Sequence, residues 1–197
     1  MDRLPMVERR AQLIQAALAV ASRDGIEAAT VRAIAAEAGV SLGVVHYCFE
    51  DKNELLREVG EAIAVQRVDR VDLPLIPDPD ARTVIGAALA TVWEAMRERR
   101  GAQLLSFELT TAALRNPELR GVATAQLERN LLAARELLDE AAAAAVVRWT
   151  VPTTLLARLT VATLDGIALA WLVDNDTPAA DQALSALTDH LTTQTKR

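Results

Sequence analysis

One side of a short helix predicted near residue 42 carries small and polar groups that suit binding rather than reaction. Ser41 and His46 can form hydrogen bonds through their side chains, and Gly43 lets the helix backbone approach a partner closely. Such a face fits the edges of bases in the major groove of DNA. The residues predicted to face outward there are Ser41, Leu42, Gly43, Val44 and His46.

The sequence holds little that could catalyse a reaction or bind a metal. Its two histidines and single cysteine form no nucleophile and base pair and no metal-ligand spacing, and no glycine-rich phosphate loop is present. Cys48 cannot form an intramolecular disulfide, and we interpret it as a small packing residue. We therefore expect no enzyme activity, no metal and no cofactor.

Two helices and a turn must position the outward face. Thr30 is a good N-cap for a first helix, Gly39 ends that helix in a tight turn, and Ser41 can cap the next helix. A bracing helix, a tight turn and a second helix with one apolar and one small or polar side together indicate a helix-turn-helix. The residues on the apolar side of this unit are Ile34, Ala35, Val40, Val45, Cys48 and Phe49.

Helical periodicity continues on both sides of this motif. A helix is predicted over about 8–24, and another begins at Asp51, whose side chain can cap it while Glu54 reaches back. Three prolines then predict a loop over 73–80. The predicted division is 1–50 for a helix-turn-helix head and 51–197 for a larger helical body, joined by a helix over about 51–72; the resemblance described below implies that the head binds DNA and that the body binds an effector and dimerises.

The remaining sequence also has the helical period, and no stretch alternates as a strand does. Leucine and alanine are abundant and aromatic residues make up only 3% of the chain, which favours helix over sheet. The fold class expected is all-α, with about nine helices. The predicted helices of the body are 81–99, 101–115, 117–147, 153–174 and a last one opened by Thr177 and Pro178.

The overall charge does not by itself predict a nucleic-acid partner. The formal net charge is -6, whereas phosphate binding usually leaves a basic footprint. Within 30–49, however, the only charged residues are Arg32 and Glu37, so that surface does not repel DNA. The lone cysteine fits a reducing cytoplasm, and the apolar stretch interrupted by Asp165 is too short for a bilayer.

The run Thr-Val-Arg-Ala-Ile-Ala-Ala-Glu-Ala-Gly-Val-Ser-Leu-Gly-Val-Val-His-Tyr-Cys-Phe-Glu-Asp-Lys-Asn-Glu-Leu-Leu resembles the tetracycline-repressor (TetR/AcrR) family of regulators. The match extends from Arg9 to about Ile63, and its specificity comes from several elements that occur together. The resemblance implies a three-helix DNA-binding head, a helical ligand-binding body and a homodimer formed through the last two helices. The function it implies is a repressor that a small molecule releases from a pseudo-palindromic operator.

The resemblance also assigns roles to single residues. It places Thr30, Tyr47 and Lys52 on backbone phosphates, and Ser41, Leu42, Gly43, Val44 and His46 against base edges. This chain departs from the family pattern where Cys48 takes a position often held by histidine, and where the recognition helix lacks arginine and lysine. Shape readout of the DNA is therefore expected to matter more than direct contacts.

Effector sites are apolar pockets with a few polar groups, and the body contains residues of both kinds. Packing in the core is the alternative role for each of them, and the acids Glu108 and Asp165 can instead be exposed or paired. Three tryptophans, among them Trp149, could form a cage for a cation, although helix spacing does not bring them together. The pocket candidates are Trp93, Met96, Leu104, Phe107, Glu108, Asn130, Asp165 and Trp171.

A different function class remains open at this level. The apolar C-terminal helices could bind another protein, so that the chain would be a helical interaction module without DNA binding. The sequence names neither the effector nor the operator.

Overall fold

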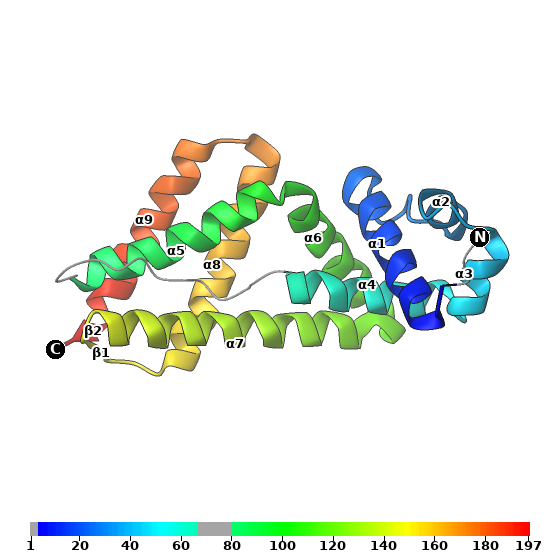
Figure 1. Cartoon of the computed structure of the whole chain (residues 1–197). Helices are drawn as coiled ribbons and strands as arrows, with labels where there is room; N and C mark the ends of the chain where they lie inside the picture. Colours follow the sequence, from blue (N-terminus) through cyan, green and yellow to red (C-terminus); the bar gives the residue numbers. More distant parts are fainter. Residues whose placement is uncertain (1–3, 67–79) are drawn as a thin grey trace. The chain divides into compact units, whose positions relative to one another are not determined.

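A computed structural model describes residues 4–66 and 80–197. Its described part holds nine α-helices, one 3-10 turn and two very short strands (Figure 1). The elements are α1 (Met6–Asp24), α2 (Val31–Glu37), α3 (Leu42–Cys48), α4 (Lys52–Gln66), α5 (Ala81–Glu98), α6 (Arg100–Arg115), η1 (Pro117–Leu119), α7 (Arg120–Ala144), β1 (Arg148–Trp149), α8 (Thr153–Asp174), α9 (Thr177–Thr193) and β2 (Thr195–Lys196).

The all-α prediction is confirmed, with one difference. The sequence analysis predicted no strand, whereas β1 and β2 form an antiparallel ladder that pairs Arg148 with Lys196 and Trp149 with Thr195. Helix α7 ends at Ala144, and Val146 takes φ 53 shortly after it. The next residues form β1, which pairs with β2 near residue 197. Two residues per strand are too few to produce an alternating pattern, so the sequence carries no signal for this ladder.

Most predicted helix ends lie within a few residues of the observed ones. The predicted helix over 117–147 instead begins as the 3-10 turn η1 and ends at Ala144. The predicted linking helix is described only as far as Gln66, so its last part, 67–72, lies outside the described residues, as does most of the predicted loop over 73–80.

The chain packs as two compact units. Unit 1 comprises 1–67 and 101–126, and unit 2 comprises 68–100 and 127–197. In unit 1, α4, α6 and the start of α7 therefore pack together with the three helices of the predicted head. The division of the chain at residue 50 into a DNA-binding part and an effector-binding part stays a prediction about function.

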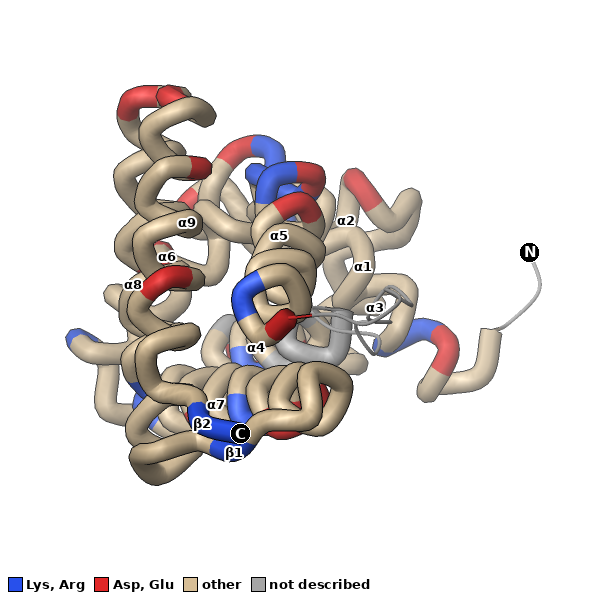
Figure 2. The backbone as a smooth tube through the Cα atoms, turned by 90° about the vertical axis from the view of Figure 1, so that its left-hand side faces the viewer, with Lys and Arg blue, Asp and Glu red and all other residues tan. Residues whose placement is uncertain are grey.

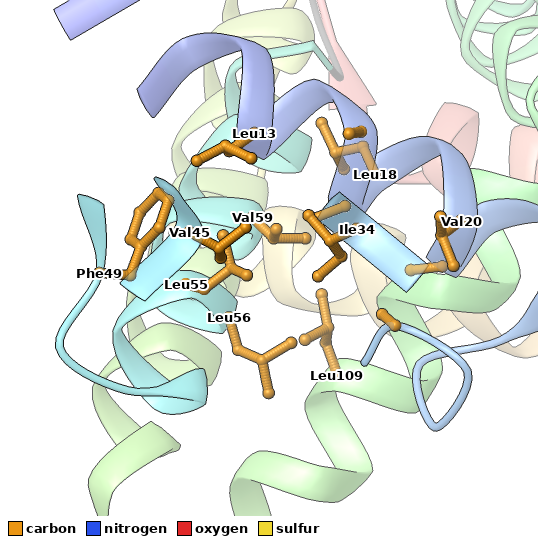
Figure 3. Close-up of a cluster of buried hydrophobic side chains, with 14 of the residues drawn as sticks. Leu13, Leu18, Val20, Ile34, Val45, Phe49, Leu55, Leu56, Val59 and Leu109 are labelled. Carbon is orange, nitrogen blue, oxygen red and sulfur yellow. The ribbon is translucent and has the colours of Figure 1, made fainter. Parts of the chain in front are cut away.

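One apolar core holds unit 1 together (Figure 3). Leu13 and Leu18 of α1 pack with Ile34 of α2, and the α3 and α4 side chains close the same cluster from the other side. Helix α6 contributes Leu109 to it as well. Because α2 and α3 have only seven residues each, they owe their stability to this packing rather than to helix propensity.

In unit 2, α9 packs against both α5 and α8. Helix α8 is apolar on almost every side, and Figure 2 shows few charged positions along α8 and α9. By length and composition alone α8 could cross a membrane, but 39% of its most apolar window is already buried inside the protein. The exposed large apolar residues of α8 are Leu155, Leu159, Leu169 and Val173.

Gly101 is required where α6 begins beside α1. A Cβ atom at Gly101 would lie 2.6 Å from the Ser22 carbonyl oxygen, which belongs to backbone and cannot swing away. We expect Gly101→Ala to lower the free energy of unfolding by about 1–3 kcal/mol, the usual cost of forcing extra atoms into a packed contact. Urea denaturation measures this change.

Gly121→Ala is the matched control, because nothing lies within 4 Å of the Cβ position at Gly121 in α7. We expect this variant to be as stable as the parent or up to about 1 kcal/mol more stable, since alanine favours helix. Equal destabilisation by both substitutions would contradict a close contact at Gly101.

Candidate nucleic-acid interface

The turn between α2 and α3 is built as the sequence predicts, except at Ser41. The Thr30 hydroxyl accepts a hydrogen bond from the Ala33 amide at 3.2 Å and caps α2, and Gly39 takes φ 67 in the turn. Ser41 stands at the N-cap position of α3, but its side chain makes no capping hydrogen bond. The Val44 amide donates instead to the Ser41 carbonyl oxygen at 3.0 Å. The predicted cap is therefore wrong.

Helix α3 has one buried and one exposed side. Val45, Cys48 and the following Phe49 are buried in the core of unit 1. Tyr47 is 74% exposed, and Val44 is half-buried and packs against the core, so it presents less surface than predicted. The other residues that were predicted to face outward, Ser41, Leu42, Gly43 and His46, are exposed.

Arg10 of α1 fixes the end of α3 next to the start of α4. Its guanidinium lies 4.4 Å from the centroid of the Phe49 ring and donates to the Cys48 carbonyl oxygen. The same group donates to Glu54 at 2.9 Å and to Glu58 at 2.7 Å, both on α4. These contacts join three helices, and hydrogen bonds to charged groups are among the strong ones in proteins.

The predicted cap at Asp51 is present at the start of α4, but Glu54 reaches back one residue further than predicted, to Glu50. The Asp51 carboxylate accepts a hydrogen bond from the Glu54 amide at 2.7 Å, and the Glu54 carboxylate accepts from the Glu50 amide at 2.7 Å. The hydrogen bond from Glu50, followed by the one from Arg10, lowers the pKa of Glu54. The side chain of Lys52 lies outside the described part of the structure, so its predicted phosphate contact stays a prediction.

The predicted pocket residues of unit 1 all lie on α6, at helical spacing. Leu104 is 46% exposed, and Phe107 is half-buried. Glu108 is paired, because its carboxylate accepts a hydrogen bond from the Ile26 amide at 2.8 Å, just after the end of α1. This carboxylate therefore fixes α6 to the segment between α1 and α2.

In unit 2 the structure brings two of the predicted pocket residues together. Trp93 and Trp171 meet edge to face with ring centroids 5.6 Å apart, and the Arg100 guanidinium lies 4.7 Å from the centroid of the Trp171 ring. Both indole N–H groups are satisfied, by Asp181 and by Thr177. The two tryptophans therefore form a packed cluster, and the cation that lies against the Trp171 ring is the side chain of Arg100.

Trp149 makes no ring contact with this pair. Trp149 lies on β1 and donates to the Leu138 carbonyl oxygen at 3.2 Å, so no three-tryptophan cage forms among them. Met96 and Asn130 are half-buried, and Asp165, also half-buried, already has an interaction partner.

Sequence reasoning missed Arg10 as a functional residue. Its partners lie 38 to 48 positions further along the chain, and no local pattern links them. It also missed the buried polar residues of the interior, which include Gln103, Ser106, Gln126 and Thr160. Polar residues placed among apolar ones on α6, α7 and α8 were the only signal available.

Two family models together match most of the chain. The model described as bacterial regulatory proteins, tetR family, matches residues 13–59, and that of the BetI-type transcriptional repressor, C-terminal, matches residues 75–196. The HTH-type nicotine-responsive transcriptional repressor HdnoR of Paenarthrobacter nicotinovorans is 31% identical over 190 residues, which cover 95% of each chain. The chain belongs to the tetR family.

Solved structures agree with this assignment. The multidrug binding protein EbrR, crystallised with imidazole, is 31% identical, covers 93% of this chain and 90% of its own, and gives a TM-score of 0.63. A TetR transcription regulator from Haloarcula marismortui covers 96% of this chain and all of its own with a TM-score of 0.78, but at 17% identity it shows the fold alone.

The predicted function is confirmed at the level of the family. This TetR-family chain is a ligand-responsive, DNA-binding transcriptional repressor, and regulators of the family bind operator DNA and small molecules and are typically dimers. Nothing in the comparisons supports the alternative of a helical interaction module without DNA binding.

The lowered pKa of Glu54 predicts how the stability of this regulator depends on pH. A carboxyl whose pKa is lower in the folded than in the unfolded protein adds stability above its unfolded pKa, about 4.3 for glutamate. That contribution disappears as the pH falls through the folded pKa. We expect Glu54→Gln to be less stable than the parent near pH 7, with a difference that shrinks steadily below about pH 4.

Thermal unfolding of both proteins between pH 3 and pH 7 measures the difference. A difference that stays the same over this whole range would show that the charge of Glu54 does not stabilise the start of α4.

Proposed function

We propose that the exposed side of α3 enters the major groove of operator DNA. The observation that carries this proposal is the contrast between its two sides, since Val45 and Cys48 are buried while Leu42, His46 and Tyr47 are exposed. The packing and the Arg10 contacts hold the helix rigidly, so its outer side is free for a partner. A helix held in this way is what recognition of a groove needs.

Phosphate contacts come from Tyr47 near the end of α3 and from groups beside this helix. Tyr47 is 74% exposed and its hydroxyl suits a phosphate oxygen, and Thr30 is exposed at the start of α2. The start of α4, with Lys52 as its first residue, supplies positive charge and the positive end of a helix dipole. These contacts set the register of the protein on DNA.

Few side chains can read the bases. Ser41 and His46 can form hydrogen bonds, Leu42 offers an apolar contact, and Gly43 permits a close approach. Without arginine or lysine on α3, part of the specificity comes from the shape and deformability of the operator. We infer that the protein acts in the cytoplasm by binding, without catalysis.

A homodimer forms through α8 and α9. The two helices pack on each other, yet α8 keeps an exposed apolar stripe with Leu155 59% and Leu169 50% exposed. Small residues lie along the same side, so a second copy can approach closely. An isologous contact places two heads on successive major grooves about 34 Å apart, which matches a pseudo-palindromic operator. The small exposed residues are Ala162, Gly166 and Ala170.

An effector releases the protein from DNA by changing the geometry of the head. Helix α6 shares the core of α1 to α4 through Leu105 and Leu109, and Glu108 ties it to the Ile26 amide. A shift of α6 therefore displaces the segment that supports α2. Coupling of about 1–3 kcal/mol would change operator affinity by one to two orders of magnitude. Two relatives are named for their ligands, as a nicotine-responsive repressor and a multidrug binding protein.

Selection of bound fragments from the source genome tests DNA binding and supplies an operator. With that operator, Tyr47→Ala should weaken binding to all sequences alike, because it removes a phosphate contact. His46→Ala should change which base is preferred, at a cost of about 1–3 kcal/mol for the preferred one. Binding titrations with a set of single-base operator variants separate the two effects.

Both side chains are exposed, so neither substitution should alter thermal stability. If both variants lost affinity by the same factor on every duplex, the assignment of His46 to the bases would be wrong.

The dimer surface is tested by Leu169→Glu. This substitution places a carboxylate opposite its own copy in an apolar contact, and we expect monomers at protein concentrations on the order of micromolar, together with weaker operator binding. Light scattering after size-exclusion chromatography gives the mass. Leu114→Glu is the control, since Leu114 is 65% exposed on α6 and should leave the dimer intact. A dimeric Leu169→Glu variant would place the interface elsewhere.

A further inference from the structure

The interior of unit 2 contains hydrogen-bond donors that have no acceptor. In the described part of this unit they are Nε and Nη2 of Arg129 on α7, Nε of Arg97 on α5, and the hydroxyl of Thr160 on α8. Buried polar groups are nearly always paired, so each exception calls for an occupant, whether a water, an ion or a ligand. Three different helices supply these donors, and all of the donors come from one unit.

Arg129 stands at the border of the buried side of α7. Its neighbour Asn130 is followed by Ala134, Leu137 and Leu138, which are buried at helical spacing. Arg129 is half-buried, and within the described residues it makes no hydrogen bond or ion pair. Its Nε and Nη2 atoms are covered and have no hydrogen-bond partner.

The two covered atoms form one edge of a planar guanidinium. Their N–H groups point in parallel and match the two oxygens of a carboxylate. A single guanidinium balances the single negative charge of a carboxylate, whereas a doubly charged phosphate would keep one charge unpaired. A monocarboxylate is therefore the ligand that this edge fits best.

Thr160 provides a second, independent sign of a missing partner. Several helical threonines of the described residues donate to the carbonyl oxygen four residues earlier, as Thr91, Thr110 and Thr188 do. Thr160 is completely buried on α8, yet its hydroxyl makes no such bond. A threonine that leaves its local acceptor unused keeps the hydroxyl for another group.

We propose that unit 2 binds a small organic monocarboxylate, held by two parallel hydrogen bonds from Nε and Nη2 of Arg129. This inference rests on the proposed effector response, since the carboxylate would be the recognised group of the effector. A carboxylate would differ from the ligands printed for two similar proteins, which are nitrogen bases. HdnoR is named as nicotine-responsive, and EbrR was crystallised with imidazole and with proflavin. The carboxylate would pair the covered edge of the Arg129 guanidinium and so stabilise the folded protein with its ligand bound.

Three probes of one size test the charge that the site prefers. Benzoate, benzamide and benzylamine are added to the purified full-length protein, and binding is followed by thermal unfolding and calorimetry. We expect benzoate to raise the unfolding temperature in a concentration-dependent manner, with little effect from the amide and none from the amine. No shift with benzoate, or a larger shift with benzylamine, would overturn the proposal.

Variants of Arg129 test whether the response to benzoate depends on the two parallel donors of its guanidinium. Arg129→Lys keeps the charge but loses the parallel donors, and we expect benzoate to bind about tenfold more weakly. Arg129→Gln should abolish the response. Arg135→Gln is the control on the same helix, because Arg135 is 56% exposed and paired with Asp139, and it should respond as the parent does. An unchanged benzoate response in Arg129→Gln would also overturn the proposal.

The protein without ligand provides a second readout. Arg129→Met removes covered donors that have no acceptor, so we expect it to unfold at a higher temperature than the parent while it loses the benzoate response. A lower unfolding temperature would contradict the proposal, because the guanidinium would then already have a stabilising partner in the protein without ligand. Operator binding is measured in a separate experiment. If the proposed DNA recognition failed while benzoate still bound, the two results would show that only the DNA-binding proposal is wrong.

Discussion

The orientation of α3 depends on the apolar core that α1, α2, α3, α4 and α6 share. Seven residues cannot hold a helix in water, so α3 exists because Val45 and Cys48 are buried in that core. Arg10 adds a polar clamp that joins the end of α3 to α4 across the Phe49 ring. The exposed side of α3 is therefore presented at a fixed angle, and the DNA recognition that we propose depends on this constraint.

The same core explains how a ligand can act on DNA binding. Helix α6 enters the core of unit 1, approaches α1 closely at Gly101 and receives the Ile26 amide on Glu108. Packed cores respond to displacement by discrete shifts rather than by smooth deformation. In the proposed mechanism, a change in the position of α6 therefore changes the support of α2 and α3, so that the two heads of the dimer no longer match the groove spacing.

Local chemistry made part of this structure predictable. Thr30 and Gly39 set the start and the end of α2 through contacts a few residues away, and the period of apolar residues divided α3 into its two sides. Long-range partners could not be predicted, as the Arg10 clamp and the meeting of Trp93 with Trp171 show. The cap at Ser41 failed because a backbone carbonyl competed for the same amide.

The central claim is that α3 enters a groove of operator DNA, where phosphate contacts at its end and beside it hold it in place. Salt dependence of binding to a selected operator and to a scrambled duplex of equal length tests this most directly. Phosphate contacts release counterions, so we predict that the logarithm of both affinities falls linearly with the logarithm of salt concentration, while the operator stays preferred throughout. Affinities that do not change with salt, or that never differ between the two duplexes, would contradict it.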